Sequence, residues 1–278
     1  MRGESGASGS IEITTHDVAL PKLPPELRGQ SIVQISDLHR GCGGTDSLIC
    51  EAIARVNELD ADFVAITGDF VDEEKQDILP VVKMVSGIRA KRGVFACLGN
   101  HDQRGDPLLL TSALDAAGIT VLHNRPAEVA PGLWFAGVDD LLEGEPDIDA
   151  ALSGVPHDAA LVFLAHNPST FDRVREPRES LMLSGHTHGG QIVLPFPTPW
   201  MICEFHLRTP YVHGWYRRGA ARLYVNRGIG VTGPPLFARR YHCPPEISVF
   251  HIRDGVEEKT GEEERNVRRI RNRGKQMV

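Results

Sequence analysis

The sequence predicts an α/β protein with the architecture of a four-layer sandwich, in which two mixed β-sheets pack together and helices flank them. Two observations favour this fold class. In the first half of the chain, short apolar strands alternate with helical segments, which is typical of parallel sheets. In the second half, strand-like segments follow one another with few helical patterns between them. We therefore expect two packed sheets with helices on their outer sides.

In the first half, a unit of strand, polar motif and helix occurs three times. Each strand is a short apolar run, and each helix has apolar residues at helical spacing. The predicted strands are 31–36, 62–67 and 93–98, and the predicted helices are 45–59, 78–88 and 107–117. Gly118 is placed to end the last of these helices.

The second half and the start of the chain supply the other predicted strands. Residues 11–20 alternate in part between polar and apolar side chains, and Pro21 then breaks the pattern. We expect an edge strand there, because proline is tolerated at the edge of a sheet. The remaining predicted strands are 133–138, 161–165, 181–183, 191–194, 222–225 and 247–252.

One domain is expected over residues 11–253. Residues 1–10 are polar and rich in glycine and serine, and we expect them to be disordered. Residues 254–278 are first acidic and then basic, and this pattern predicts a charged, exposed C-terminal tail.

Composition argues against several classes of protein. The net charge of −7 provides no basic field of the kind that nucleic-acid binding needs. No apolar run is long enough to span a bilayer. The five cysteines are widely scattered without a CxxC pair, which fits reduced thiols better than a disulfide framework. We therefore expect a cytoplasmic protein, with a peripheral position at the membrane as an open alternative.

The most informative stretch is residues 183–191, in which His186 and His188 stand two positions apart among small residues. In a strand or tight turn, such positions project to the same side, so the two imidazoles reach one small volume. The flanking glycines leave room close to the main chain. A lone pair of this kind is weak evidence, because surface loops produce it by chance.

Four other stretches place polar residues at the ends of predicted strands, where α/β sheets build their sites. The additional candidates are Asp37, His39, Asp69, Asn100, His101, Asp102 and His166. Carboxylates, imidazoles and one amide, without cysteine, suit Mn, Fe or Zn. So many donors exceed the needs of one ion that keeps an open position, and they favour two ions bridged by a carboxylate.

The motifs, in this order, resemble those of the calcineurin-like metallophosphoesterase superfamily. They are D-L-H at 37–39, G-D at 68–69, G-N-H-D at 99–102, H-N at 166–167 and G-H-T-H at 185–188. Residues 189–192, Tyr216, and residues 223–230 and 245–247 also resemble one bacterial branch. That branch contains membrane-associated phosphoesterases and a pyrophosphatase acting on UDP-diacylglucosamine. The resemblance implies phosphoester hydrolysis by attack of a metal-activated hydroxide on phosphorus.

The resemblance also implies a role for each residue. The implied ligands are Asp37, His39 and His188 for the first ion and Asn100, His166 and His186 for the second, with Asp69 bridging both. His101 is then not a ligand but a general acid or charge stabiliser near the leaving group, and Asp102 orients it. Manganese is the favoured metal among Mn, Fe and Zn.

Each of these residues also has a simpler interpretation. A single histidine is more often a core or surface residue than a ligand, and Asp69 alone fits a turn at the end of a strand. Five motifs in the family's order make coincidence improbable. A catalytically inactive relative would usually lack a ligand, and no ligand is missing in this sequence.

The motif around Asp69 departs from that of protein Ser/Thr phosphatases, which carry G-D-x-V-D-R-G. Here Glu73 stands in place of their phosphate-binding arginine, and Glu74 follows it. This difference argues against a protein phosphatase and leaves phosphodiesters, cyclic nucleotides and pyrophosphates. A carboxylate at this position is expected to repel a monoester dianion more strongly than a diester.

Residues 195–216 are rich in aromatic residues and proline, include Trp200 and Trp215, and follow the last histidine motif directly. One interpretation is a hydrophobic lid that binds a lipid-like substrate or touches a membrane. The other is an ordinary loop that is buried on the sandwich. The sequence leaves both open.

The sequence therefore predicts a dinuclear metal-dependent phosphoesterase acting on a phosphodiester or pyrophosphate, with a lipid-linked substrate as an open variant. The alternatives are a cyclic-nucleotide or general phosphodiesterase and, in a different class, a non-catalytic membrane-peripheral metal-binding module. The expected partner is a small-molecule or lipid-linked phosphoester, with a membrane surface as the open alternative. Neither a nucleic acid nor a protein partner is implied.

Overall fold

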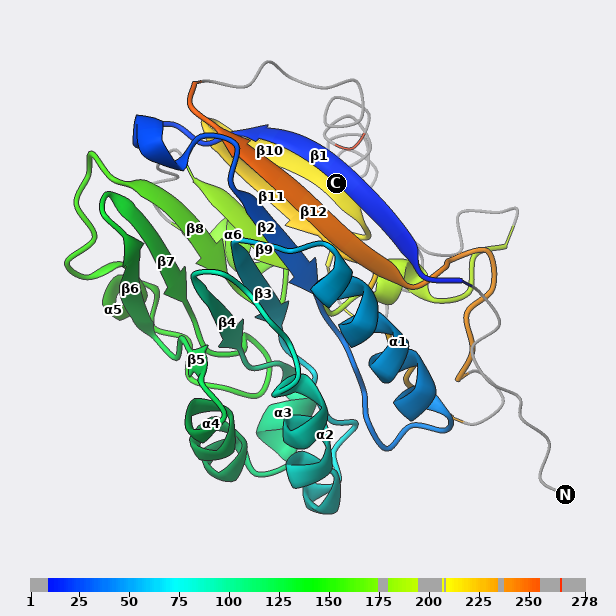
Figure 1. Ribbon diagram of the computed structural model, residues 1–278. Coiled ribbons are helices and arrows are strands. Elements are labelled where there is room, and N and C mark those ends of the chain that lie inside the picture. Colours follow the sequence, from blue (N-terminus) through cyan, green and yellow to red (C-terminus); the bar gives the residue numbers. More distant parts are fainter. Residues whose placement is uncertain are drawn as a thin grey trace, which may run out of the picture.

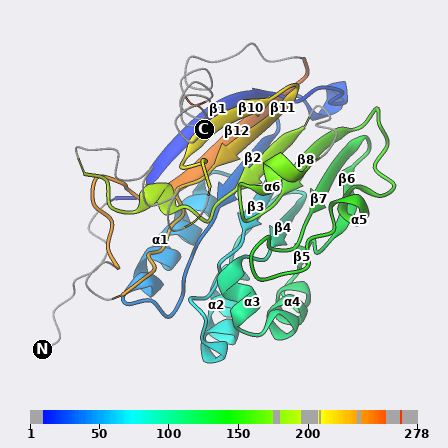
Figure 2. The same cartoon turned by 180° about the vertical axis from the view of Figure 1, so that it is seen from behind.

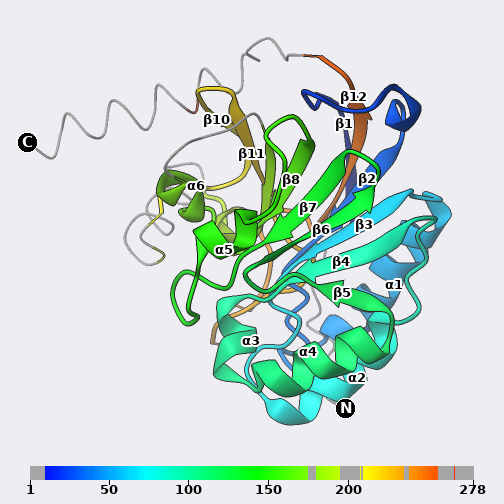
Figure 3. The same cartoon turned by 90° about the vertical axis from the view of Figure 1, so that its left-hand side faces the viewer.

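The computed structural model describes residues 10–174, 180–194, 207, 209–234, 238–255 and 266 (Figure 1). Two 6-stranded sheets pack together, with the strand orders β1-β12-β2-β3-β4-β5 and β10-β11-β9-β8-β7-β6. Helices lie on the outer sides of both sheets, as Figure 3 shows from one side. The predicted four-layer sandwich of two mixed sheets is confirmed.

The first sheet joins the beginning and the end of the domain. Its strands are β1 (Glu12–Ala19), β2 (Ser31–Ile35), β3 (Phe63–Thr67), β4 (Gly93–Cys97), β5 (Ile119–Val121) and β12 (Glu246–Arg253). Strands β2 to β5 run parallel to one another, whereas β12 runs antiparallel to β2. β1 pairs with β12 at the edge of the sheet, which confirms the predicted edge strand.

The second sheet comes from the later part of the chain. Its strands are β6 (Arg125–Ala130), β7 (Leu133–Gly137), β8 (Ala160–Leu164), β9 (Leu181–Ser184), β10 (Gly214–Arg218) and β11 (Ala221–Val225). Strands β7, β8, β9 and β11 run parallel, whereas β6 and β10 are antiparallel to their neighbours. The short strands β5, β6 and β10 were not predicted from the sequence.

The helices follow the strands along the chain. They are α1 (Thr45–Glu58), α2 (Ile78–Val85), α3 (Asn100–Arg104), α4 (Pro107–Ala116), α5 (Ile148–Leu152) and α6 (Thr170–Arg173). Short 3-10 helices are η1 (Pro25–Leu27), η2 (Lys75–Asp77) and η3 (His188–Gly190). The three predicted helices are confirmed as α1, α2 and α4, and Gly118 has the left-handed φ of 81° expected after a helix. Figure 2 shows α5 and α6 on the side of the second sheet.

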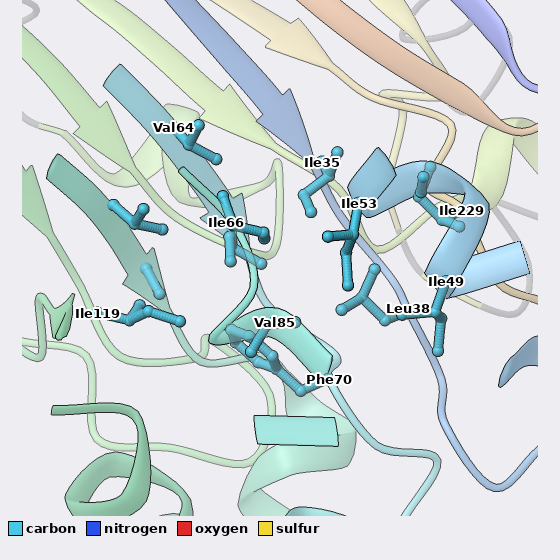
Figure 4. Packing of buried hydrophobic residues seen from close by; sticks show 14 of the residues in the cluster. Ile35, Leu38, Ile49, Ile53, Val64, Ile66, Phe70, Val85, Ile119 and Ile229 are labelled. Carbon is cyan, nitrogen blue, oxygen red and sulfur yellow. The ribbon is translucent and has the colours of Figure 1, made fainter. Parts of the chain in front are cut away.

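Three apolar clusters separate the four layers. One lies between the first sheet and its helices and includes Val33, Ile49 and Val81; Figure 4 shows part of it. A second fills the space between the two sheets, and a third lies on the outer face of the second sheet. Successive strand residues point to opposite faces, so Ile32 belongs to the cluster between the sheets while Val33 packs under the helices.

The prediction of a strand at residues 191–194 is wrong. Ile192 forms an isolated bridge with Tyr241, and the preceding residues form η3. The cause lies at Gln191, whose φ of 54° is left-handed. Its side chain donates to the carbonyl of Thr232 and accepts from the Thr232 N–H, so a distant loop fixes a conformation that a strand excludes.

The aromatic segment 195–216 is divided by the structure. Tyr211, Trp215 and Tyr216 are buried, with Trp215 between the sheets and the two tyrosines on the outer face of the second sheet. These three residues therefore belong to the core, and the lid interpretation is wrong for them. The rest of the proposed lid, including Trp200, lies outside the described residues.

The proposed disordered residues 1–10 and charged tail 254–278 lie outside the described residues, apart from Ser10, Asp254, Gly255 and Asn266. Asn266 is buried, and its side-chain amide donates to the carbonyl of Trp215 at 2.8 Å. In the part of the chain that the structure covers, no helix has the length and apolar character needed to cross a bilayer.

Trp215→Ala is expected to lower the free energy of unfolding by about 3–5 kcal/mol, because it leaves a large cavity between the sheets. Trp215 is 4% exposed and packs against Tyr224, Phe250 and the guanidinium of Arg222. Chemical denaturation measures the change. As a control, Leu108→Ala in α4, where the side chain is 81% exposed, should stay within about 0.5 kcal/mol of the parent. Equal stability of the two variants would contradict this placement of Trp215.

Candidate metal centre

The candidate residues all lie directly after strands, at one end of the two sheets. Asp37 and His39 follow β2, Asp69 follows β3, and Asn100, His101 and Asp102 begin α3 after β4. His166 follows β8, and His186 and His188 follow β9. Because β2 to β4 are parallel, and β8 and β9 are parallel, their carboxyl ends bring these loops together. Hydrogen bonds join the two sheets here: the N–H of His186 donates to Asp37 at 3.0 Å.

The backbone of the site is held in an unusual conformation. The non-glycine residues of the site with left-handed φ are Asp37 (53°), His39 (46°), Asp69 (54°), His186 (73°) and His188 (51°). Residues with a Cβ rarely adopt this region, and each instance costs free energy that the surrounding fold must offset. Left-handed conformations are concentrated at these aspartates and histidines. This indicates that the fold accepts unfavourable backbone angles in order to place their side chains.

Asp69 occupies the middle of the cluster. Its Oδ1 accepts the backbone N–H of His101 at 2.9 Å. Its Oδ2 lies 3.4 Å from Nε2 of His39 on one side and 3.1 Å from Nε2 of His166 on the other. One carboxylate oxygen thus faces histidines from both sheets, which is the arrangement that a bridging carboxylate requires.

A first group of donors lies on the His39 side of Asp69. Nε2 of His39 and Nε2 of His188 are 3.0 Å apart, and Oδ1 of Asp37 is 3.4 Å from the latter. Two ring nitrogens and a carboxylate oxygen, all buried, therefore point at one small volume. Such a group is typical of a site for a divalent cation.

A second group of possible metal ligands lies on the His166 side. Its ligand atoms are buried and lack hydrogen-bond partners among the described residues. Oδ1 of Asn100, Nε2 of His166 and Nε2 of His186 are buried and make no hydrogen bond with any residue that the structure describes. Nε2 of His166 is close to Asp69, but the geometry is not that of a hydrogen bond. Buried polar atoms without partners are rare in folded proteins, and an ion is one explanation for several of them at one place. This oxygen and nitrogen set fits Mn, Fe or Zn.

The far side of several rings is held by an acceptor. Nδ1 of His39 lies 3.1 Å from the carboxylate of Asp72, and Nδ1 of His166 lies 2.7 Å from the carbonyl of Thr67. An acceptor at Nδ1 places the proton there and leaves the Nε2 lone pair free for a metal. Nδ1 of His101 is held in the same way, 2.6 Å from the carbonyl of Asp72.

The prediction that Asp102 orients His101 is wrong. The Asp102 carboxylate accepts the backbone N–H groups of Asp69, Phe70, Val71 and Gly99 instead. Its distances from these nitrogens are 2.8 to 3.2 Å. Asp102 therefore ties the loop after β3 to the start of α3, and the carbonyl of Asp72 takes the role of orienting His101.

Close packing explains two of the glycines in the motifs. A Cβ on Gly99 would collide with the Asp69 carboxylate, and a Cβ on Gly185 would collide with Ser36 and the Asp37 carboxylate. Both glycines let the main chain approach a buried carboxylate.

Burial and mutual charge set the protonation of the cluster. Burial lowers the pKa of His186 to about 3 and holds that of His188 well below its usual value. Burial would raise the pKa of Asp69, but the neighbouring His166 holds it well below its usual value. Neutral imidazoles at His186 and His188 are the form that binds a metal. His166 differs, because burial lowers its pKa but the Asp69 carboxylate raises it well above the usual value, so this ring must release a proton to bind an ion.

Two residues near the site were missed from the sequence. Asp72, in the motif that contains Asp69, binds His39, and its carboxylate also accepts the hydroxyl of Thr232 at 3.0 Å. Its place three positions after Asp69 was the available signal. Arg240 is 7% exposed and contacts the His188 loop, and nothing in the local sequence indicates this.

At the exposed rim of the site, the carboxylate of Glu73 forms an ion pair with Arg104. Nη1 of Arg104 lies 2.9 Å from Oε1 of Glu73, and Nη2 lies 2.8 Å from Glu143. Oε1 of Glu73 is also 3.6 Å from Nδ1 of His101. Glu73 therefore does not repel an anionic substrate on its own. The side chains of Glu73, Arg104 and Glu143 together carry one net negative charge.

Comparison with known proteins agrees with these motifs. Residues 31–190 match the family model described as calcineurin-like phosphoesterase. The chain is 34% identical to the metallophosphoesterase YkuE of Bacillus subtilis, over 87% of this chain and 86% of that protein. It is 32% identical to the phosphodiesterase YaeI of Escherichia coli, over 80% and 81%.

A further relative, a transmembrane protein with a metallophosphoesterase domain from Danio rerio, is 32% identical over 79% of this chain. The chain spans 53% of the length of that relative. The family model covers more than half of the chain, and the relatives extend the similarity beyond it. The chain therefore belongs to the calcineurin-like phosphoesterase family and is a metal-dependent phosphoester hydrolase.

Proposed function

We propose that this protein is a dinuclear phosphoesterase that hydrolyses a phosphodiester or pyrophosphate bond. The observation that supports it best is the position of Asp69 Oδ2 between His39 and His166, at 3.4 and 3.1 Å. A group of possible metal ligands lies on each side of this oxygen, as a pair of ions would need. The name of the Escherichia coli relative, a phosphodiesterase, supports the preference for diesters.

In this proposal the ligands divide as the motifs imply. Asp37, His39 and His188 would hold the first ion, Asn100, His166 and His186 would hold the second, and Asp69 would contribute to both. When bound, two divalent ions lower the pKa of a coordinated water and neutralise charge on the phosphoryl oxygens. Manganese is the favoured ion, and metal analysis of the purified protein tests this choice.

The chain itself supplies the group that assists departure of the leaving oxygen. The Asp72 carbonyl accepts the Nδ1 proton of His101, so a proton passed to the leaving oxygen would come from Nε2 of the doubly protonated ring. The His101 side chain is 16% exposed at the rim of the cluster, and its ring centroid lies 4.7 Å from that of His39. A proton donor beside the ions but outside their ligand sets suits a general acid.

A lipid-linked phosphoester remains the second candidate. Leu194 and Tyr241 are 46% and 51% exposed. Their backbone segments are joined, because the N–H of Val193 donates to the carbonyl of Tyr241 at 2.9 Å. Both are near the His188 loop, and an acyl chain beside the site would cover them. Co-sedimentation with phospholipid vesicles tests the accompanying proposal of a peripheral membrane position.

Asp69→Asn should remove most bound metal, because a neutral amide cannot balance two dications as a carboxylate does. The measurement is metal per chain by atomic emission after dialysis against Mn²⁺. Asp60→Asn is a matched control, since Asp60 also has a left-handed φ, 49°, but its exposed side chain pairs with Lys91. Two ions per chain and unchanged turnover in Asp69→Asn would remove it as the bridge.

His101→Ala should lower kcat by about 10²- to 10⁴-fold while metal content stays at the parent level. The loss should shrink for substrates with a good leaving group such as nitrophenolate, which needs little protonation. His123→Ala serves as the control, because the His123 side chain is 50% exposed and follows β5 rather than a site motif. An equal loss for good and poor leaving groups would refute the proton-donor role.

Diesters and pyrophosphates should have a higher kcat/KM than matched monoesters, because the rim carries net negative charge and a monoester dianion carries one charge more. Glu73→Gln should then raise kcat/KM for nitrophenyl phosphate by about twofold to fivefold, the range of an exposed charge interaction. Its neighbour control is Glu74→Gln. A parent enzyme that prefers monoesters would count against the proposed substrate class.

A further inference from the structure

The buried guanidinium of Arg240 contacts His188, which belongs to the candidate metal centre. Its Nε donates to the carbonyl of Gly230 at 2.9 Å, and its Nη2 donates to the carbonyl of Arg227 at 2.7 Å. Nη1 lies 3.5 Å from the carbonyls of His188 and Cys243. Within the part of the chain covered by the structure, no carboxylate lies within ion-pair distance of Arg240. Among the described residues, the partners of this cation are therefore backbone carbonyls, the His188 ring and the Cys243 thiol.

In the contact between Arg240 and the His188 ring, the ring nitrogen Nδ1 faces a hydrogen-bond donor, whereas Nδ1 of a metal-binding histidine usually faces an acceptor. Nη2 of Arg240 lies 3.4 Å from Nδ1 of His188. A guanidinium has donors only, so Nδ1 must accept in this contact. By contrast, Nδ1 of His39 and Nδ1 of His166 face the oxygen acceptors of Asp72 and Thr67.

This reversal has a direct consequence for metal binding. A neutral imidazole that binds metal through Nε2 carries its proton on Nδ1. In His188 that proton would point at a donor of Arg240, and the positive charge of the guanidinium would oppose the nearby dication. On the other side of Asp69, the proton of His166 points at the carbonyl of Thr67.

We propose that Arg240 is a positioning residue that makes the Asp37–His39–His188 position the weaker of the two metal positions. This inference rests on the proposed dinuclear function. The protein then holds one ion firmly at Asn100, His166 and His186 and exchanges the other. Arg240 fixes the His188 loop in place and at the same time limits the affinity of that loop for metal.

Equilibrium dialysis of the Mn²⁺-loaded full chain against a series of chelator-buffered Mn²⁺ concentrations tests the proposal. Electron paramagnetic resonance distinguishes coupled ion pairs from single ions. The parent should show two unequal dissociation constants, and His188→Ala should keep the tighter one. Arg240→Met, which removes the charge at similar length, should tighten the weaker position by about 10-fold or more, the scale of outer partners of metal-binding histidines. Arg240→Lys, which retains the charge, should not tighten it.

A purely structural role predicts the opposite order, because methionine loses every hydrogen bond of Arg240 and lysine keeps some. Weaker Mn²⁺ binding in Arg240→Met than in Arg240→Lys would therefore overturn the proposal, as would equal constants in the parent. Arg125→Met is the control, since Arg125 also donates to a backbone carbonyl, that of Val121, but lies on β6. If Arg240→Met does not fold, Arg240→Gln, which also removes the charge, takes its place with the same expected result. Loss of the tighter constant in His188→Ala contradicts the assignment in either case. Fewer than two ions in the parent would refute the dinuclear function itself.

Discussion

The placement of one carboxylate oxygen, Oδ2 of Asp69, is the constraint on which the rest of the site depends. It must lie within reach of His39 from the first sheet and of His166 from the second. Two sheets packed face to face, with parallel strands ending on one side, make this possible. The Asp102 carboxylate then locks the loop after β3 by accepting its backbone N–H groups, so that Asp69 cannot turn away. The fold thus serves to hold an ionised carboxylate where burial alone would disfavour it.

The cluster would be unfavourable without the structure around it. Left-handed backbone at Asp37, Asp69 and His188 costs free energy, as do buried polar atoms without a hydrogen-bond partner in the described part of the chain. The apolar clusters on both faces of each sheet offset this cost. Such a concentration of local strain is expected where function, rather than stability, determines the conformation. Two bound dications would coordinate the buried oxygen and nitrogen atoms that have no hydrogen-bond partner among the described residues.

The architecture, and the meeting of the polar strand ends, could be predicted from local patterns. The role of each residue was implied only by the family resemblance and stays a prediction. Alternating strands and helices specify the sandwich, and polar motifs at strand ends specify which loops meet. The errors have a common origin in contacts between distant parts of the chain. Gln191 is held by Thr232, and Trp215 lies between two sheets, so neither the lost strand nor the buried tryptophan had a local signal. The same holds for Asp102, whose carboxylate serves backbone amides 31 to 33 residues away as well as that of Gly99, and for Arg240.

Anomalous X-ray scattering from crystals grown with Mn²⁺ tests the central claim most directly. Data collected on either side of the manganese absorption edge locate the ions independently of the protein atoms. We expect two peaks roughly 3.5–4 Å apart with the Asp69 carboxylate between them. One peak should contact Asp37, His39 and His188, and the other should contact Asn100, His166 and His186. A single peak, or two peaks of which neither touches Asp69, would contradict the account.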